Sequence, residues 1–148
     1  MKKVNLVPGI LLVIIFIISG SCNKSGAKSK KELMTQAPWK LDNAGIDTDL
    51  NGTVTKKDTS FIKSCNTDDT YTFQADGSGI FDEGVSKCSM GDQQSQPFSW
   101  QFTDNERKLV LGVDTANVLS LDDNSLKIYY DEDSGSGTAE RYLTVFKH

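Results

Sequence analysis

The segment from Asp47 to Asp58 carries the clearest chemistry in this chain, because side chains that bear oxygen recur there at alternate positions. Read as a twelve-residue calcium loop, it has oxygen ligands at positions 1, 3 and 5, a glycine for the sharp turn at position 6 and a carboxylate at position 12. The alternative is a solvated turn, because Asp, Asn and Gly are also ordinary loop residues. The predicted ligands of a structural Ca²⁺ ion are Asp47, Asp49, Asn51, Thr53 through its backbone carbonyl, Thr55 and Asp58.

Cys65 and Cys88 are the two cysteines beyond residue 22. An even pair in an exported chain indicates a disulfide. A thiol nucleophile or a zinc site would need histidine partners, and the one histidine of the sequence is His148, its last residue. We therefore expect the two thiols to be bonded to each other, which stabilises a fold by about 3 kcal/mol for a loop of this length.

The remaining polar residues do not form a recognisable catalytic set. Asp82 and Glu83 are neighbours on a predicted strand, where adjacent side chains point to opposite faces and cannot share an acid–base role. His148 alone cannot activate a nucleophile. The formal net charge of −4, with no basic stripe, argues against a nucleic-acid partner. We expect a protein that is not an enzyme.

The first 22 residues have the composition of an export signal. Lys2 and Lys3 precede an apolar run over 10–18 and the small residues that lead to Cys22, as in a secretory signal peptide. The run is too short for a membrane span, which needs about 20 apolar residues. Cys22 resembles the acylated cysteine of the bacterial lipobox, and the alternative is an ordinary signal that happens to precede a cysteine.

These features predict a domain organisation and a location. Residues 1–21 are the signal peptide, 22–36 are the lipidated cysteine and a flexible tether, and 37–148 are the domain. Acyl chains on one residue hold a soluble domain firmly at a membrane. Asn23 after the anchor resembles the sorting pattern of outer-membrane lipoproteins that face the periplasm. We expect a monomer at that location, with the membrane as its partner.

From Thr70 onward, apolar and polar residues alternate over short segments separated by turn residues, which is typical of antiparallel strands. Short strands joined by tight turns form a meander, and closure of a meander removes its exposed edges. We therefore predict an all-β fold, an eight-stranded antiparallel up-and-down β-barrel. Its strands are expected at about 39–42, 70–74, 79–85, 98–102, 108–112, 116–121, 126–131 and 141–147.

One stretch resembles a known family. Cys65-Asn-Thr-Asp-Asp-Thr-Tyr-Thr-Phe-Gln-Ala-Asp-Gly, then Phe81-Asp-Glu-Gly, Cys88 and the Trp-centred strand 98–102, is similar to the lipocalin-like lipoproteins of Bacteroidetes. The likeness covers about residues 37–147. It implies a lipocalin-like barrel anchored in the cell envelope, and it implies no particular ligand, because that family is largely uncharacterised.

Small eight-stranded barrels are either filled with side chains or hold one small ligand. We expect a barrel that binds a small apolar ligand, and the alternative is a filled barrel that serves as an interaction or structural module of the envelope. Tyr129, Tyr130 and Tyr142 would line a cavity in the first case and belong to the core in the second, and Phe61 and Ile62 would cover one mouth. The large residues whose direction decides between the two are Tyr71, Phe73, Phe81, Phe98, Trp100, Phe102 and Phe146.

Overall fold

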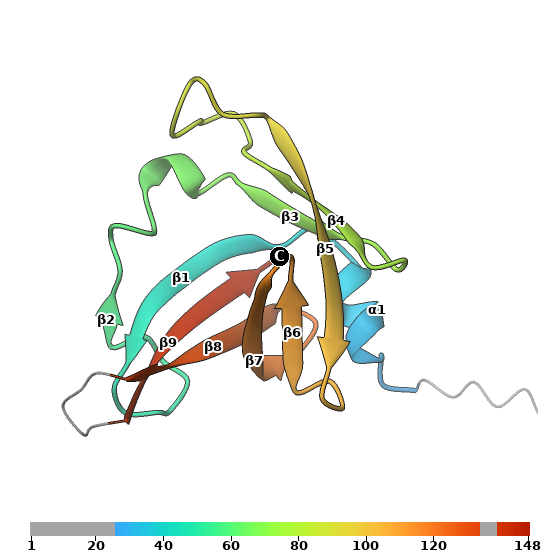
Figure 1. Cartoon of the computed structure of the whole chain (residues 1–148), viewed down its shortest axis with the longest axis vertical. Coiled ribbons are helices and arrows are strands. Elements are labelled where there is room, and N and C mark those ends of the chain that lie inside the picture. Colours follow the sequence, from blue (N-terminus) through green and yellow to red (C-terminus); the bar gives the residue numbers. More distant parts are fainter. Residues whose placement is uncertain (1–25, 134–138) are drawn as a thin grey trace, which may run out of the picture.

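Nine antiparallel strands in one sheet make up most of the structure (Figure 1). The computed structural model describes residues 26–133 and 139–148, so the predicted signal peptide and Cys22 lie outside the described residues. Within the described part, no helix is long and apolar enough to cross a membrane. The strands are β1 (Lys40–Asp47), β2 (Lys56–Lys57), β3 (Thr70–Phe73), β4 (Ser78–Asp82), β5 (Ser95–Thr103), β6 (Lys108–Leu111), β7 (Asp114–Leu121), β8 (Ser125–Asp133) and β9 (Ala139–Lys147).

The all-β antiparallel fold is confirmed, but the prediction of a closed eight-stranded barrel is wrong. The strand order is β2-β1-β9-β8-β7-β6-β5-β4-β3, and the two-residue strand β2 is the ninth member. The sheet curls until β3 returns to the side of β1 (Figure 1). There, among the described residues, one pair bridges the gap: Trp39 and Tyr71 exchange backbone hydrogen bonds of 2.9 and 2.8 Å. A single bridge is not a ladder, so the sheet stays open between β1 and the four-residue strand β3.

Alternating side chains fill one end of the curled sheet. Phe73 contacts Phe98 and Trp100 edge to face at centroid distances of 5.3 and 5.4 Å, and Trp100 contacts Phe102 in the same way at 5.7 Å. Edge-to-face contacts between aromatic rings add to the stabilisation from burial alone. The buried core that they join comprises Met34, Trp39, Phe73, Trp100, Leu109, Ala116, Leu126, Ile128 and Phe146.

The helix α1 (Lys30–Thr35) packs against this filled end. Its presence differs from the prediction of a flexible tether over residues 22–36. Ser29 and Glu32 form a capping box, in which each side chain accepts a backbone N–H of the other residue. Met34 is fully buried in the core, and its carbonyl accepts a 3.0 Å hydrogen bond from the indole N–H of Trp39. The folded unit therefore begins before residue 37, because a helix that buries its apolar face is part of the core.

The strand β5 serves two halves of the sheet. Its first residues, 95–99, pair with β4, and its last residues, 100–103, pair with β6. Among the described strands, the first half of β5 has no partner on its β6 side apart from one contact, in which the carbonyl of Ser99 accepts the N–H of Gly112 at 2.8 Å. Pro97 lies on the same edge of β5 as Ser99, because backbone groups alternate between the two edges of a strand.

Candidate ligand-binding cavity

A cavity of about 520 Å³ lies on the inner face of the sheet, next to the core. Ile128 and Phe146 belong to both the core and the cavity wall, so the hollow begins where the filled end stops. Residues two apart on a strand share a face, which explains why β8 and β9 each contribute alternate side chains. The lining residues are Phe61, Tyr71, Leu111, Asp114, Ile128, Tyr130, Tyr142, Thr144 and Phe146.

A second hollow of about 260 Å³ shares Tyr71 and Leu111 with the cavity. Its other lining residues are Phe81, Gln96, Pro97, Phe98 and Gly112, so it lies along the unpaired first half of β5. Apolar surface predominates in both hollows. Together they extend from the inside of the sheet to its open side at β5.

One wall of the cavity is ordered by the carboxylate of Asp58. It accepts hydrogen bonds from the backbone N–H and the hydroxyl of Ser60, at 2.9 and 2.6 Å, and from the hydroxyl of Tyr142 at 2.9 Å. The hydrogen bonds from Ser60, and then the one from Tyr142, lower the pKa of Asp58. The N–H of Phe61 also bonds to Asp58, at 3.2 Å, and its ring meets that of Tyr142 edge to face. Phe61 lies at the cavity, and the N–H of Ile62 bonds to the carbonyl of Asp58 at 3.1 Å, which closes a single helical turn over 58–62.

Two tyrosine hydroxyls of the cavity have raised pKa values. Burial is the main cause at Tyr71, whose pKa rises to about 12, and the charge of Asp69 adds to it. Burial followed by the charge of Asp114 raises the pKa of Tyr130. Both hydroxyls therefore stay neutral at physiological pH, as hydrogen-bonding groups in an otherwise apolar wall.

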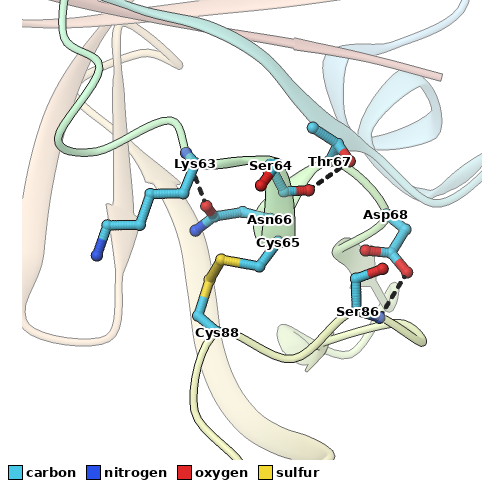
Figure 2. The surroundings of a disulfide bond; sticks show 8 residues. All are labelled: Lys63, Ser64, Cys65, Asn66, Thr67, Asp68, Ser86 and Cys88. Atoms are coloured by element: carbon cyan, nitrogen blue, oxygen red, sulfur yellow. Dashed lines mark hydrogen bonds between the residues drawn. A yellow bond between two sulfur atoms is a disulfide. The ribbon is translucent and has the colours of Figure 1, made fainter.

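The predicted disulfide between Cys65 and Cys88 is confirmed, with a Cα–Cα distance of 5.1 Å. It joins the 3₁₀ helix Ser64–Asn66 to the loop between β4 and β5, as Figure 2 shows. The carboxylate of Asp68 supports the same junction, because it accepts the N–H groups of Val85 and Ser86 at 2.7 and 3.0 Å. These hydrogen bonds lower the pKa of Asp68. Two loops beside the cavity are thus held to each other covalently and by a charged hydrogen-bond acceptor.

Asp69 and Glu83 form a buried acidic pair beside this junction. They directly precede and follow Thr70 and Asp82, which are paired across β3 and β4, so they face each other across the strands. Their exposed fractions are 5 and 9%, and Asp69 Oδ1 and Glu83 Oε2 have no hydrogen-bond partner within the described part of the chain.

Burial, and then the charges of Glu83, Asp68 and Asp82, raise the pKa of Asp69 to about 6. Asp82, by contrast, accepts hydrogen bonds from Ser95, Gly84 and Gln94, which lower its pKa. The pKa values of these neighbouring carboxylates thus shift in opposite directions, because burial and like charges act on Asp69 whereas hydrogen-bond donors act on Asp82.

Asp47, the first predicted calcium ligand, is neutralised by the protein itself. Its fully buried carboxylate accepts N–H bonds from Asn51 and Gly52, at 3.2 and 2.8 Å, and lies 3.3 Å from Nε of Arg141. The guanidinium of Arg141 also bonds to the carbonyl of Leu50 and stacks 4.8 Å from the ring centroid of Tyr129. This cluster lies on the opposite face of the sheet from the cavity, because 129 and 141 alternate with the cavity positions 130 and 142.

The other predicted ligands also have protein partners. Asn51 accepts the N–H of Thr53 at 2.9 Å, Thr55 donates to the carbonyl of Ile46 at 2.8 Å, and Asp58 bonds to Tyr142 at the cavity. Among the described residues, no three acidic, cysteine or histidine side chains are grouped so that they could hold a metal ion. Asp47, Asp49 and Asp58 are thus not brought to one point, and the arrangement does not fit a calcium ion.

The three tyrosines predicted to line a cavity lie on two different faces of the sheet. Tyr130 and Tyr142 line the cavity, whereas Tyr129 lies under Arg141 on the other face. Sequence reasoning missed Leu111 and Asp114 as lining residues. Period-2 alternation assigns a residue to one face of the sheet. The cavity, however, depends on which part of the curled sheet is filled by side chains, and no local sequence pattern encodes that.

No protein-family model matches this chain, and no curated protein matches it.

Proposed function

We propose that this protein is a membrane-tethered lipoprotein whose curled sheet binds a small apolar ligand in the cavity between β3, β6, β8 and β9. The observation that carries the proposal is an open hollow of about 520 Å³ with a mainly aromatic and aliphatic wall. Ligand sites commonly occupy 300–1,000 Å³ and are lined by apolar side chains with a few polar groups. The tyrosine hydroxyls, Thr144 and Asp114 are the polar groups of this wall.

The distribution of the large aromatic residues favours this proposal over a filled structural module. Phe73, Trp100 and Phe102 pack against one another at the end closed by α1. Tyr71 and Phe146, which contact each other at 5.4 Å, stand at the boundary and leave the other end hollow.

The position of α1 gives the proposed anchor a defined relation to the cavity. Lys28, just before the helix, bonds to Asp123 in the turn after β7, whereas Asp114 at the start of β7 lines the cavity. The eight residues of β7 separate these points by about 25 Å at ~3.4 Å per residue. A chain anchored through Cys22 would therefore meet the domain at its filled end, and the cavity would face away from the anchor point.

Binding of the fluorescent apolar probe N-phenyl-1-naphthylamine tests the proposal. The full chain is placed in lipid nanodiscs, and the signal of empty nanodiscs is subtracted. We expect saturable binding that Leu111→Trp weakens at least tenfold, because the larger ring fills space shared by the two hollows. The matched control is Ile80→Trp, which adds the same ring at a position 41% exposed on β4. Non-saturable binding, or equal binding by Leu111→Trp and the control, would refute the proposal.

A further inference from the structure

We propose that the cavity selects an organic cation, an ammonium group carried on an apolar body, and rejects carboxylate-bearing ligands such as fatty acids. This inference rests on the proposed function and adds the charge of the ligand to it. The wall contains five aromatic rings, from Phe61, Tyr71, Tyr130, Tyr142 and Phe146, together with the carboxylate of Asp114, while none of the described lining residues is Lys, Arg or His.

Acidic groups surround this wall. Asp114 belongs to the lining and acts on Tyr130, Asp69 acts on Tyr71, and Asp58 lies 2.9 Å behind the hydroxyl of Tyr142. Asp114 has no ion-pair partner among the described side chains. The carboxylates thus give the surroundings of the cavity a negative charge, and the π faces of aromatic rings carry partial charge of the same sign.

The positive groups near the cavity lie elsewhere. Lys56 and Lys57 line a separate hollow of about 260 Å³ that shares Tyr142 with the cavity, and they are absent from the cavity wall. Arg141 is held by Asp47 on the opposite face of the sheet. A bound carboxylate would consequently lose its hydration without gaining a cationic partner in this wall, which is strongly unfavourable.

A cation gains two interactions in the same place. The face of an aromatic ring attracts an ammonium group within about 6 Å of its centroid, and quaternary ammonium ligands are commonly recognised by several such rings together. Asp114 supplies the opposite full charge at the exposed margin of the wall. The apolar body of the ligand would then occupy the part of the cavity formed by Leu111, Ile128 and Phe146.

Three probes that share one benzyl group test the inference: benzyltrimethylammonium, benzyl alcohol and phenylacetate. Their dissociation constants are measured by calorimetry with the full chain in nanodiscs, against empty nanodiscs. We expect benzyltrimethylammonium to bind at least tenfold more tightly than phenylacetate, with benzyl alcohol between them. Asp114→Asn should weaken the cation about tenfold and leave benzyl alcohol within twofold. The charge-matched control, Asp104→Asn, lies in the turn between β5 and β6 and should change neither.

A second pair of variants tests the rings independently of Asp114. Tyr130→Phe keeps the aromatic face and should keep cation binding, whereas Tyr130→Leu should lose several-fold of it and retain benzyl alcohol. Phenylacetate binding as tightly as the cation, or unchanged cation binding in both Asp114→Asn and Tyr130→Leu, would overturn the cation preference alone. Absence of binding by all three probes, together with non-saturable binding of N-phenyl-1-naphthylamine, would overturn the proposed function as well.

Discussion

Replacing Asp69 by Asn should stabilise the protein at neutral pH. Asp69 is 5% exposed, faces Glu83 across β3 and β4, and has an oxygen without a hydrogen-bond partner among the described residues. An ionised carboxylate in this position is doubly disfavoured, by lost hydration and by the like charge opposite. Asn has nearly the same shape, carries no charge and can donate a hydrogen bond to Glu83.

The magnitude follows from the pKa of Asp69, which rises from 3.8 to about 6. A raised pKa means that the folded state binds the proton more tightly than the unfolded state. The stability that this proton contributes is therefore complete below about pH 4, declines between pH 4 and 6, and is lost above pH 6. At about 1.4 kcal/mol per pKa unit, the loss reaches about 3 kcal/mol.

Urea unfolding of the oxidised protein at pH 4 and pH 7.5 measures this effect. At pH 7.5 we expect the free energy of unfolding of Asp69→Asn to exceed that of the original protein by up to about 3 kcal/mol. At pH 4 the two free energies of unfolding should be nearly the same. Glu83→Gln should give part of the gain, because Glu83 is the largest charge acting on Asp69. The control is Asp92→Asn, in the exposed loop before β5. An Asp69→Asn protein that is no more stable than the original at pH 7.5 would refute the reasoning.

Three further predictions concern other parts of the structure. Arg141→Met should destabilise the protein by about 3 kcal/mol, because it leaves the buried carboxylate of Asp47 without its ion-pair partner. EDTA should leave the melting temperature unchanged. A clear fall in the melting temperature with EDTA, reversed by Ca²⁺, would instead support the calcium loop predicted from the sequence. Replacing Cys65 and Cys88 by Ser should cost about 3 kcal/mol in urea unfolding, and no change would mean that the junction is held by hydrogen bonds alone. Met34→Ala should cost 2–5 kcal/mol, whereas a flexible segment at this position would tolerate the change.

The sequence predicted the parts of this fold that depend on local alternation. Every predicted strand has a counterpart, because segments such as Phe98-Ser-Trp100-Gln-Phe102 place large apolar side chains on one face. The strand β2 was missed because Lys56 and Lys57 have no apolar alternation to reveal it. Sheet closure was mispredicted because it depends on a long-range pairing, which here is reduced to Trp39 and Tyr71.

The candidate site could be predicted only in part. The helix α1 has a readable signal that was overlooked, since Ser29-x-x-Glu32 before Leu33 and Met34 is a capping box ahead of an apolar pair. The calcium prediction for the loop at Asp47 lacked a contact that the sequence does not show. Its neutralising partner, Arg141, comes from β9 near the other end of the chain, and only the fold shows that a guanidinium occupies the place expected for a cation.

The open sheet has a consequence for how copies of the protein behave at high concentration. Exposed strand edges invite pairing with edges of other copies, which leads to aggregation. One edge of this sheet is β2, which consists of two exposed lysines. A strand from another copy could therefore form few backbone hydrogen bonds there and would meet the positive charge of the lysines. The unpaired half of β5 carries Pro97, which has no N–H to donate, and the turn at Gly112 already uses the carbonyl of Ser99. The other terminal strand, β3, is only four residues long, and its Tyr71 is already paired with Trp39. Short edges of this kind favour the monomer that we predict.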